Sequence, residues 1–420
     1  MTNTPKIRFK GFTDDWEQRK FASVFDGLQN NTLSRAELNY ESGTVKNVHY
    51  GDVLIKFGDY IDAAETELPY ISDDAKADKF KNSFLQDGDI IIADTAEDDT
   101  VGKCTEIQGS EGLKLLSGLH TIACRPKEKY GPMFLGYYIN SPAYHNQLKP
   151  LMQGIKVTSI SKSALQDTDM IMPKSIDEQI KIGEYFSNLD NLITLHQRKC
   201  DETKELKKYM LQKMFPKNGE TKPEIRFAGF TDDWEQRKLG DMLDRYEDPV
   251  ETPHDGYERI GIRSHAKGVF HSYVEPGKEL DTAKMHRVAA DKFILNITFA
   301  WEHAVAITEE EDAGTLVSHR FPQFSFHKDL KSHFFKFLML DRKFREYLEL
   351  CSPGGAGRNR VLNINDMLKY KINVPSVEEQ TKIGEYFDNL DNLITLHQRK
   401  CDELKEVKKY MLQNMFPKKG

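Results

Sequence analysis

The stretch Glu178–Lys217, EQIKIGEYFSNLDNLITLHQRKCDETKELKKYMLQKMFPK, occurs twice in this chain. The second copy is Glu379–Lys418, EQTKIGEYFDNLDNLITLHQRKCDELKEVKKYMLQNMFPK, and the two copies differ at five of forty positions. A protein core tolerates volume-conserving exchanges, so near-identity over surface and core together exceeds what folding requires. Two identical partner-binding faces would explain it. A recent duplication is the alternative, but a duplication would also leave the intervening segments alike.

Both copies carry apolar residues at alternating steps of three and four, the pattern of helices that pack along a seam. Pro173 and Pro375 precede the copies, and Pro216 and Pro417 stand next to last in them, so no proline interrupts the stretch between. Each copy therefore predicts a helix of about 38 residues, about 57 Å long at 1.5 Å per residue. The residues predicted to pack along the seam are Ile182, Phe186, Leu189, Ile193, Cys200, Ile383, Phe387, Leu390, Ile394 and Cys401.

A shorter repeat opens each half of the chain. Ile7–Lys20 reads IRFKGFTDDWEQRK, and Ile225–Lys238 differs from it at one position of fourteen. The segments between the repeats, Phe21–Lys174 and Leu239–Pro375, share no obvious identity, which suggests two different tasks. We therefore divide the chain into a first globular domain, a first helix, a linker, a second globular domain and a second helix, at residues 1–174, 175–217, 218–224, 225–375 and 376–420.

The order of these segments constrains their arrangement. The first helix leaves the first domain and enters the second after a short linker, so it connects them end to end. If the seams pack, the second helix runs antiparallel to the first. The predicted fold class is α+β, with two globular domains separated by two long antiparallel helices in a pseudo-two-fold, nearly circular arrangement.

The two unlike segments show a similar order of expected elements. In the first, β-rich runs at 45–57, 89–94 and 119–125 precede a helical stretch near 132–152 and an extended segment that ends at Pro173. In the second, a strand at 291–296 precedes a helix at 331–351. We expect two versions of one α+β fold, in which loops on a shared scaffold carry specificity.

The candidate contact residues come from two loops of each segment. Thr95–Lys103 and Ile297–Ala304 follow the expected strands, and Gln153–Ser159 and Gly354–Arg360 precede the closing strand. Glycines let the backbone approach a phosphate, arginine reads guanine edges and asparagine can pair with adenine. The predicted DNA-contacting residues are Lys103, Gln153, Lys156, Thr158, Ser159, Asn296, Thr298, Trp301, His303, Arg358, Asn359 and Arg360.

Ordinary structural roles compete with these assignments. Glycine-rich loops beside a strand are turns in most proteins, and a lone aromatic residue is more often part of a core. The acids Asp94, Glu97, Asp98 and Asp99 suggest a metal site at first sight, but clustered loop acids are usually solvated. We predict no metal site and no catalytic residue on this chain.

The composition of the chain excludes several classes of protein. Net charge is −7, from 59 basic and 66 acidic residues, so any nucleic-acid surface must be local. Five cysteines without a Cys-x-x-Cys pair argue against a disulfide framework and a zinc ribbon.

The longest apolar run is far short of the roughly 20 residues that span a bilayer, so we expect a cytoplasmic protein without a membrane partner. The sequence also lacks a phosphate-binding GxxxxGK[ST] loop, the Asn-Pro-Pro-Tyr/Phe tetrapeptide of adenine methylation and a HExxH motif.

The EQxKIGEYFxNLDNLITLHQRKCDE blocks after each unlike segment, with the GFTDDWEQRK openings before them, strongly resemble the specificity subunit of type I restriction-modification enzymes. The resemblance covers the whole chain. It implies that each unlike segment is a target recognition domain that reads one half of a split double-stranded DNA target, and that the repeated helices set the unread gap.

The resemblance also implies partners. Two modification subunits, which carry S-adenosylmethionine and methylate adenine N6, would dock on the repeated regions, and restriction subunits with ATP-driven, Mg²⁺-dependent activity would join them. No cofactor is expected on this chain. Because residues 21–174 hold 15 basic and 22 acidic side chains, we expect the modification subunits to meet most of the phosphate charge.

Two alternatives remain. A coiled-coil scaffold with two protein-binding globular ends would need no nucleic acid. A free-standing nuclease would use the acids of Asp94–Asp99 with Mg²⁺. Neither explains repeated helices around unlike domains as economically.

Overall fold

The computed structural model describes residues 3–217, 219–279, 284–354 and 360–417. The chain forms two compact units, one of Met1–Gln197 with Arg399–Gly420 and one of Arg198–Gln398. We call them the first and the second unit. The border between them lies inside each of the two long helices, so each unit contains one part of both helices.

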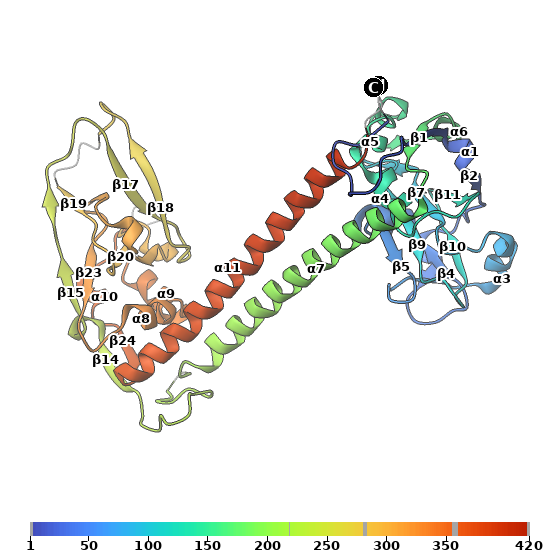
Figure 1. Ribbon diagram of the computed structural model, residues 1–420. Helices are drawn as coiled ribbons and strands as arrows, with labels where there is room; N and C mark the ends of the chain where they lie inside the picture. The colour runs from blue at the N-terminus through green and yellow to red at the C-terminus, as the bar shows by residue number, and fades with distance from the viewer. Residues whose placement is uncertain (1–2, 218, 280–283, 355–359, 418–420) are drawn as a thin grey trace. The chain divides into compact units, whose positions relative to one another are not determined.

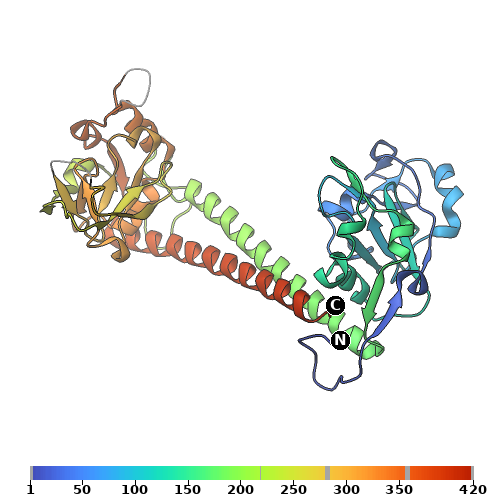
Figure 2. The same ribbon diagram turned by 90° about the horizontal axis from the view of Figure 1, so that it is seen from above.

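The repeated stretches are helices of the predicted length. α7 spans Ile176–Lys213 and α11 spans Val377–Asn414, each with 38 residues. A serine hydroxyl begins each of them, because Ser175 Oγ accepts from Glu178 N and Ser376 Oγ from Glu379 N. Figure 1 and Figure 2 draw α7 in green and α11 in red as unbroken helices.

Within the first unit the beginning of α7 packs against the end of α11. Ile182 and Phe186 are buried, and the Phe186 ring stacks on Phe416, just beyond the end of α11, with centroids 5.9 Å apart. Further along, Cys401 Sγ approaches the carbonyl oxygen of Ile193 at 3.9 Å. The start of α7 thus lies against the end of α11, so the two helix segments of this unit are antiparallel.

The second unit repeats this packing with the helices exchanged. Phe387 of α11 stacks on Phe215, beyond the end of α7, with centroids 6.1 Å apart, and Cys200 Sγ approaches the carbonyl oxygen of Ile394 at 3.7 Å. Most predicted seam residues are buried, whereas Ile193 and Ile394 are half-buried. The buried ones are Ile182, Phe186, Leu189, Cys200, Ile383, Phe387, Leu390 and Cys401.

The globular part of the first unit is α+β. Among its described residues one sheet has the order β2-β11-β7-β9-β5 and another the order β10-β4-β6-β3, while β1 pairs with β13 and β8 with β12. In Figure 1 these strands gather around one end of α7, with α4 nearby. The strands are β1 Glu17–Lys20, β2 Phe25–Gly27, β3 Leu38–Asn39, β4 Lys46–Val48, β5 Tyr60–Asp62, β6 Tyr70–Ile71, β7 Ile90–Ala93, β8 Thr95–Ala96, β9 Cys104–Gln108, β10 Leu115–Ser117, β11 Thr121–Pro126, β12 Thr158–Ser159 and β13 Asp169–Met172, and the helices are α1 Phe21–Val24, α2 Tyr50–Ile55, α3 Asp74–Ala77, α4 Phe134–Asn140, α5 Pro142–His145 and α6 Lys162–Gln166.

The second unit has the same kind of fold. Its described sheets have the orders β15-β23-β20-β21 and β16-β19-β22-β17-β18, and β14 pairs with β24 as β1 does with β13. The strands are β14 Glu235–Lys238, β15 Leu243–Tyr246, β16 Pro249–Val250, β17 Tyr257–Ile262, β18 Val269–Val274, β19 Met285–Arg287, β20 Phe293–Leu295, β21 Val305–Ile307, β22 Leu316–Ser318, β23 Gln323–Phe326 and β24 Lys371–Val374, and the helices are α8 Ser332–Leu338, α9 Arg342–Leu350 and α10 Ile364–Met367.

One predicted strand is wrong in part. The run 45–57 is a strand only over β4, after which the chain turns into α2. His49 begins this helix, since its Nδ1 accepts from Gly51 N at 3.1 Å. Asp52 in the first turn is held by two bonds from Arg35. These polar contacts override the β propensity of the valine and isoleucine side chains.

None of the helices in the described part of the chain combines the length and the apolar character that crossing a bilayer would need.

Candidate nucleic-acid interface

The two candidate loops of the first unit lie against each other. β8 begins directly after β7, and it pairs antiparallel with β12 through Thr95 with Ser159 and Ala96 with Thr158. The amide of Ile160 also donates to the carbonyl oxygen of Asp94 at 2.9 Å. The fold therefore brings together two loops that are about 60 residues apart in sequence.

The second of these loops presents an exposed tip. Gln153 and Ser159 exchange both backbone hydrogen bonds, at 2.9 and 2.8 Å, which closes a small loop between them. Gly154 has φ of +118°, and a Cβ at this position would lie 2.0 Å from the carbonyl oxygen of Val157, so only glycine fits. Lys156 is exposed, and its neighbour Ile155 is fully exposed. A cation beside an unburied aliphatic side chain is suited to contact a partner surface.

Three of the four acids of the first loop, Asp94, Asp98 and Asp99, are engaged in local contacts. Asp99 forms an ion pair with Lys149 at 2.9 Å, and this hydrogen bond lowers the pKa of Asp99. Asp98 accepts from the amide and hydroxyl of Thr100. Asp94 approaches His120 Nδ1 at 3.4 Å. Within the described ranges no three His, Cys, Asp or Glu side chains are grouped so that they could hold a metal ion.

Lys103 is placed differently from its predicted role. The side chain is half-buried, and Nζ donates to the carbonyl oxygens of Leu54 and Phe57 at 2.9 and 3.0 Å. Burial lowers the pKa of Lys103. These bonds satisfy carbonyls at the end of α2, so in this conformation Lys103 stabilises the fold and is not directed to a ligand.

In the second unit, the loop after β20 is built around a side-chain turn. Asn296 Oδ1 accepts from the amide of Thr298 at 3.0 Å and from its hydroxyl at 2.7 Å. The indole Nε1 of Trp301 donates to the carbonyl oxygen of Thr298 at 3.1 Å. Phe299 at the same loop is 37% exposed. Side-chain hydrogen bonds thus link the residues of this loop, and it carries partly exposed rings.

Arg360, at the end of the closing loop, contacts the loop that follows β20. Its guanidinium lies over the Trp301 ring at 5.2 Å from the centroid, and Nη1 forms an ion pair with Glu349 at 3.2 Å. The amide of Leu362 donates to the carbonyl oxygen of Ile297, as Ile160 does to Asp94 in the first unit. The predicted contacts Arg358 and Asn359 lie outside the described residues.

His303 does not match its predicted role. It is 5% exposed, and its Nε2 forms a hydrogen bond with the carbonyl oxygen of Met339 at 2.9 Å. Burial lowers the pKa of His303, which favours the neutral ring. The left-handed backbone at His303 turns the ring into the core against Phe344. We expect no base contact from this side chain in the observed conformation.

Sequence reasoning missed two residues beside the loops. His120 has a left-handed φ of 55°, its side chain is 47% exposed, and its carbonyl accepts from the amide of Asp94. Its ring also meets Tyr50 edge to face at 5.3 Å. The other is Phe299. No periodicity marks either residue, because their positions depend on turns that only the folded chain defines.

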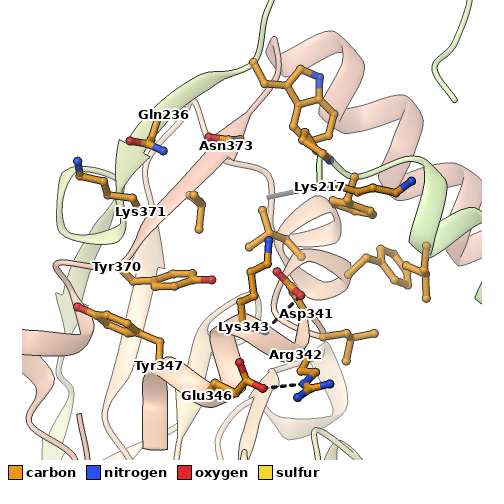
Figure 3. Close-up of a pocket in the computed structure, with 18 of the residues that line it drawn as sticks. Lys217, Gln236, Asp341, Arg342, Lys343, Glu346, Tyr347, Tyr370, Lys371 and Asn373 are labelled. Atoms are coloured by element: carbon orange, nitrogen blue, oxygen red, sulfur yellow. Dashed lines mark hydrogen bonds and ion pairs between the residues drawn. The ribbon is translucent and has the colours of Figure 1, made fainter. Parts of the chain in front are cut away.

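The second unit also contains a large cavity of about 1170 Å³ at the end of α7. Figure 3 shows Tyr347, Lys371 and Asn373 around it, from α9 and β24. None of the predicted contact residues lines it. In the first unit Tyr138 stands where the second unit has Leu338, and its hydroxyl accepts from the amide of Ile171 at 2.6 Å.

Comparisons with known proteins agree with this architecture. The family model described as "Type I restriction modification DNA specificity domain" matches residues 13–205 and 231–406. Each match covers one unlike segment together with most of the repeated helix that follows it.

Two curated relatives from Methanocaldococcus jannaschii are similar in sequence. The protein assigned as the specificity subunit of the type I restriction enzyme MjaX is 22% identical over 426 residues, which cover 98% of this chain and 95% of the relative. The specificity subunit of the type I restriction enzyme MjaVIII is 21% identical over 279 residues, covering 63% and 65%. A crystal structure of the S subunit of a type I restriction-modification system from M. genitalium has a similar fold, with a TM-score of 0.56, 12% identity and coverage of 99% and 100%.

Proposed function

The chain belongs to the type I restriction-modification DNA specificity family, and from this premise we propose that it reads a split DNA target, one half with each unit, and docks two adenine-N6 methyltransferase subunits. The observation that carries the proposal is the combination of near-identical helices with unlike loops. The same packing recurs in both units through Phe186 with Phe416 and Phe387 with Phe215, while the candidate loops differ in sequence and contacts.

Each unit would read its half-target through the paired loops. In the first unit the tip with Lys156 would enter a groove, with Gln153, Thr158 and Ser159 beside it. In the second unit the Arg360 guanidinium lies over Trp301 and pairs with Glu349 through Nη1, so the side chain is already ordered before it would exchange the Glu349 contact for a base edge. Arginine paired with guanine O6 and N7 is the commonest specific contact in the major groove.

The repeated helices would act as spacer and docking surface together. Monomeric proteins rarely expose contiguous apolar patches larger than a few hundred Å², and patches above that size mark interaction sites. Both helices carry large apolar residues that solvent reaches, several of them at matching positions of the repeat. These are Ile176, Leu192, Leu206, Tyr209, Leu393, Leu396, Val407 and Tyr410. Matching faces on the two copies would accept two copies of one partner.

In this proposal the chemistry resides on partner subunits. S-adenosylmethionine would be bound by the modification subunits, and ATP and Mg²⁺ by restriction subunits that join the complex. This chain would supply base contacts and spacing. The acidic balance of residues 21–174 supports that division, because phosphate contacts dominate the affinity for DNA.

The test compares DNA binding of the purified chain with and without a modification subunit. We expect weak, nonspecific binding by the chain alone and site-specific binding once the modification subunit is added, measured with target and scrambled duplexes at one fixed salt concentration. Equal affinity for the target without the modification subunit would contradict the proposed division of charge. Pull-downs from lysate with and without nuclease treatment would identify a scaffold that binds proteins without nucleic acid.

A further inference from the structure

The central sheets of the two units differ at one edge. β9 and β21 occupy the same place, because Thr105 pairs with Ile91 of β7 as Ala306 pairs with Ile294 of β20. In the first unit β5 covers the outer edge of β9. In the sheet that the described residues of the second unit form, β21 is itself the edge strand. The second unit thus lacks a counterpart of β5 in the part of the chain that the structure describes.

Backbone bonds and side chains both hold β5 in the first unit. It runs parallel to β9, and the amide of Glu106 donates to the carbonyl oxygen of Asp59 at 3.0 Å. The Asp59 carboxylate accepts from Lys408 of α11 at 2.7 Å. Tyr60 meets Tyr137 edge to face at 6.2 Å. An acid followed by an aromatic residue therefore anchors this strand to the helices.

The receiving groups for such a strand recur in the second unit. The repeat places Lys207 where the first unit has Lys408, and Asp391 where it has Asp190. Lys408 bonds both Asp59 and Asp190, and these carboxylates raise its pKa despite the opposing effect of burial. Lys207 bonds Asp391 at 2.5 Å, and its side chain is only 18% exposed. Among the described residues of the second unit, no carboxylate stands at Lys207 in the place that Asp59 takes at Lys408.

The shared hydrogen bonds to the helices align the remaining positions. Gly131 donates its amide to Gln179 Oε1, and Lys331 donates to Gln380 Oε1 in the second unit. Counting onward from these residues, Phe337 stands at the place of Tyr137. Its ring lies under Lys207 Nζ at 5.1 Å.

These groups line one cavity. It has a volume of about 330 Å³, and Lys207, Asp391 and Phe337 line it together with β21. Along β9 the backbone groups of successive residues point alternately toward β7 and toward β5. The amide of Glu106 points toward β5, where it donates to the carbonyl oxygen of Asp59. Ile307 occupies the matching position, so its amide and carbonyl face this cavity.

The rim specifies the charges of an occupant. Lys336 stands where Gly136 gives room to the carbonyl of Asp59; a Cβ at Gly136 would lie 2.0 Å from that oxygen, so an occupant in the second unit must lie farther from α8 than β5 lies from α4. Lys336 Nζ lies 3.7 Å from Glu309 and 3.6 Å from Asp388. Glu309, which is exposed, corresponds to Gln108, the partner of Asp62 in the β5 ladder. Glu311 and Asp312 line the same cavity. An occupant would therefore carry an acid opposite the two lysines and a base toward Glu309, Glu311 and Asp312.

We infer that the uncovered edge of β21 binds an extended segment of a partner protein that adds as a parallel strand and carries an acidic, an aromatic, an aliphatic and a basic residue in that order. The aromatic residue of the segment would lie on the Phe337 ring, its acidic residue would meet Lys207, and its basic residue would meet Glu309. Its backbone would form hydrogen bonds with the amide and carbonyl of Ile307. This inference does not depend on DNA recognition.

The probe is a fluorescent heptapeptide with the sequence of residues 57–63, FGDYIDA, in which Asp62 is replaced by lysine. Binding to the full chain is followed by anisotropy. Two N-methylated peptides provide matched controls. Methylation at the isoleucine amide removes a donor that faces the β21 edge and should weaken binding about tenfold, whereas methylation at the tyrosine amide, which faces away, should leave it nearly unchanged.

Replacing the aspartate of the peptide by asparagine should also weaken binding, because it removes the carboxylate for Lys207. The inference is overturned if the parent peptide shows no saturable binding up to about 1 mM. It is equally overturned if the two N-methylated peptides bind alike, since strand addition requires one face of the peptide backbone. Since no duplex is present, DNA recognition by the chain could fail its own test without affecting this result.

Discussion

Arg8 and Glu178 form a two-bonded ion pair across 170 residues of sequence, with Nε to Oε1 at 2.7 Å and Nη2 to Oε2 at 2.9 Å. The second unit repeats the pair as Arg226 and Glu379, at 2.6 and 2.7 Å. Both carboxylates are almost fully buried. The opening segment of each half is thus attached to the first turn of the helix that follows its globular domain.

Breaking either pair should loosen only its own opening segment. Arg8→Ala leaves the buried carboxylate of Glu178 without its cation, which costs about 3 kcal/mol in comparable pairs. We expect faster hydrogen exchange at residues 7–20 in this variant and at 225–238 in Arg226→Ala. Each variant is the control for the other. Exchange that rises in both segments of a single variant would contradict the independent attachment.

Removing the loop cations should affect one half-target each. Arg360→Ala should cost about 1 to 3 kcal/mol of binding free energy at the half-target of the second unit. Lys156→Ala, in the first unit, should lower the slope of log affinity against log salt concentration by about 1, the contribution of one phosphate contact. The measurement is binding of the assembled complex to duplexes changed in one half-target at a time. Unchanged binding and methylation of the native target would remove either residue from the interface.

The exposed tyrosines of the repeated helices test partner docking. Tyr209 and Tyr410 occupy matching positions and are 50% and 58% exposed. If each belongs to one docking face, Tyr209→Ala or Tyr410→Ala should weaken one of two methyltransferase sites by about 2 kcal/mol, roughly thirtyfold. Native mass spectrometry at limiting partner concentration should then show complexes with one modification subunit in place of two. Loss of both subunits from a single variant would count against two separate faces.

Glu106 should make the stability of the first unit pH-dependent. Burial raises the pKa of Glu106 to about 7, although the amides of Met133 and Gly136 donate to it. Between pH 4.5 and 7 the folded state therefore binds more protons at this group than the unfolded state, so its contribution to stability falls as pH rises and is constant above pH 7.

Glu106→Gln should remove this slope, which amounts to on the order of 3 kcal/mol across the interval. Hydrogen exchange of β7 and β9 at several pH values measures it, and β20 and β21 serve as control because Ile307 stands at the matching position. A variant that kept the wild-type slope would assign the slope to another group.

The sequence allowed the two long helices to be predicted, but not the pairing of the candidate loops or the placement of individual side chains. Heptad spacing and flanking prolines are local signals, so the two 38-residue helices follow from them. The inward turn of His303 and the bonds of Lys103 to Leu54 and Phe57 depend on tertiary contacts that no local pattern encodes. The same holds for the missing cover of β21, because β5 joins its sheet through a parallel pairing between distant residues.

The most direct test of two unlike readers on one repeated frame is an exchange of residues 21–174 for the corresponding segment of another family member. The complex carrying the exchange is expressed in a host, and the methylated adenines of its genome are mapped. We expect one half of the methylated target to change while the other half and the gap remain the same. A change in both halves, or in neither, would contradict the assignment of one half-target to each unit.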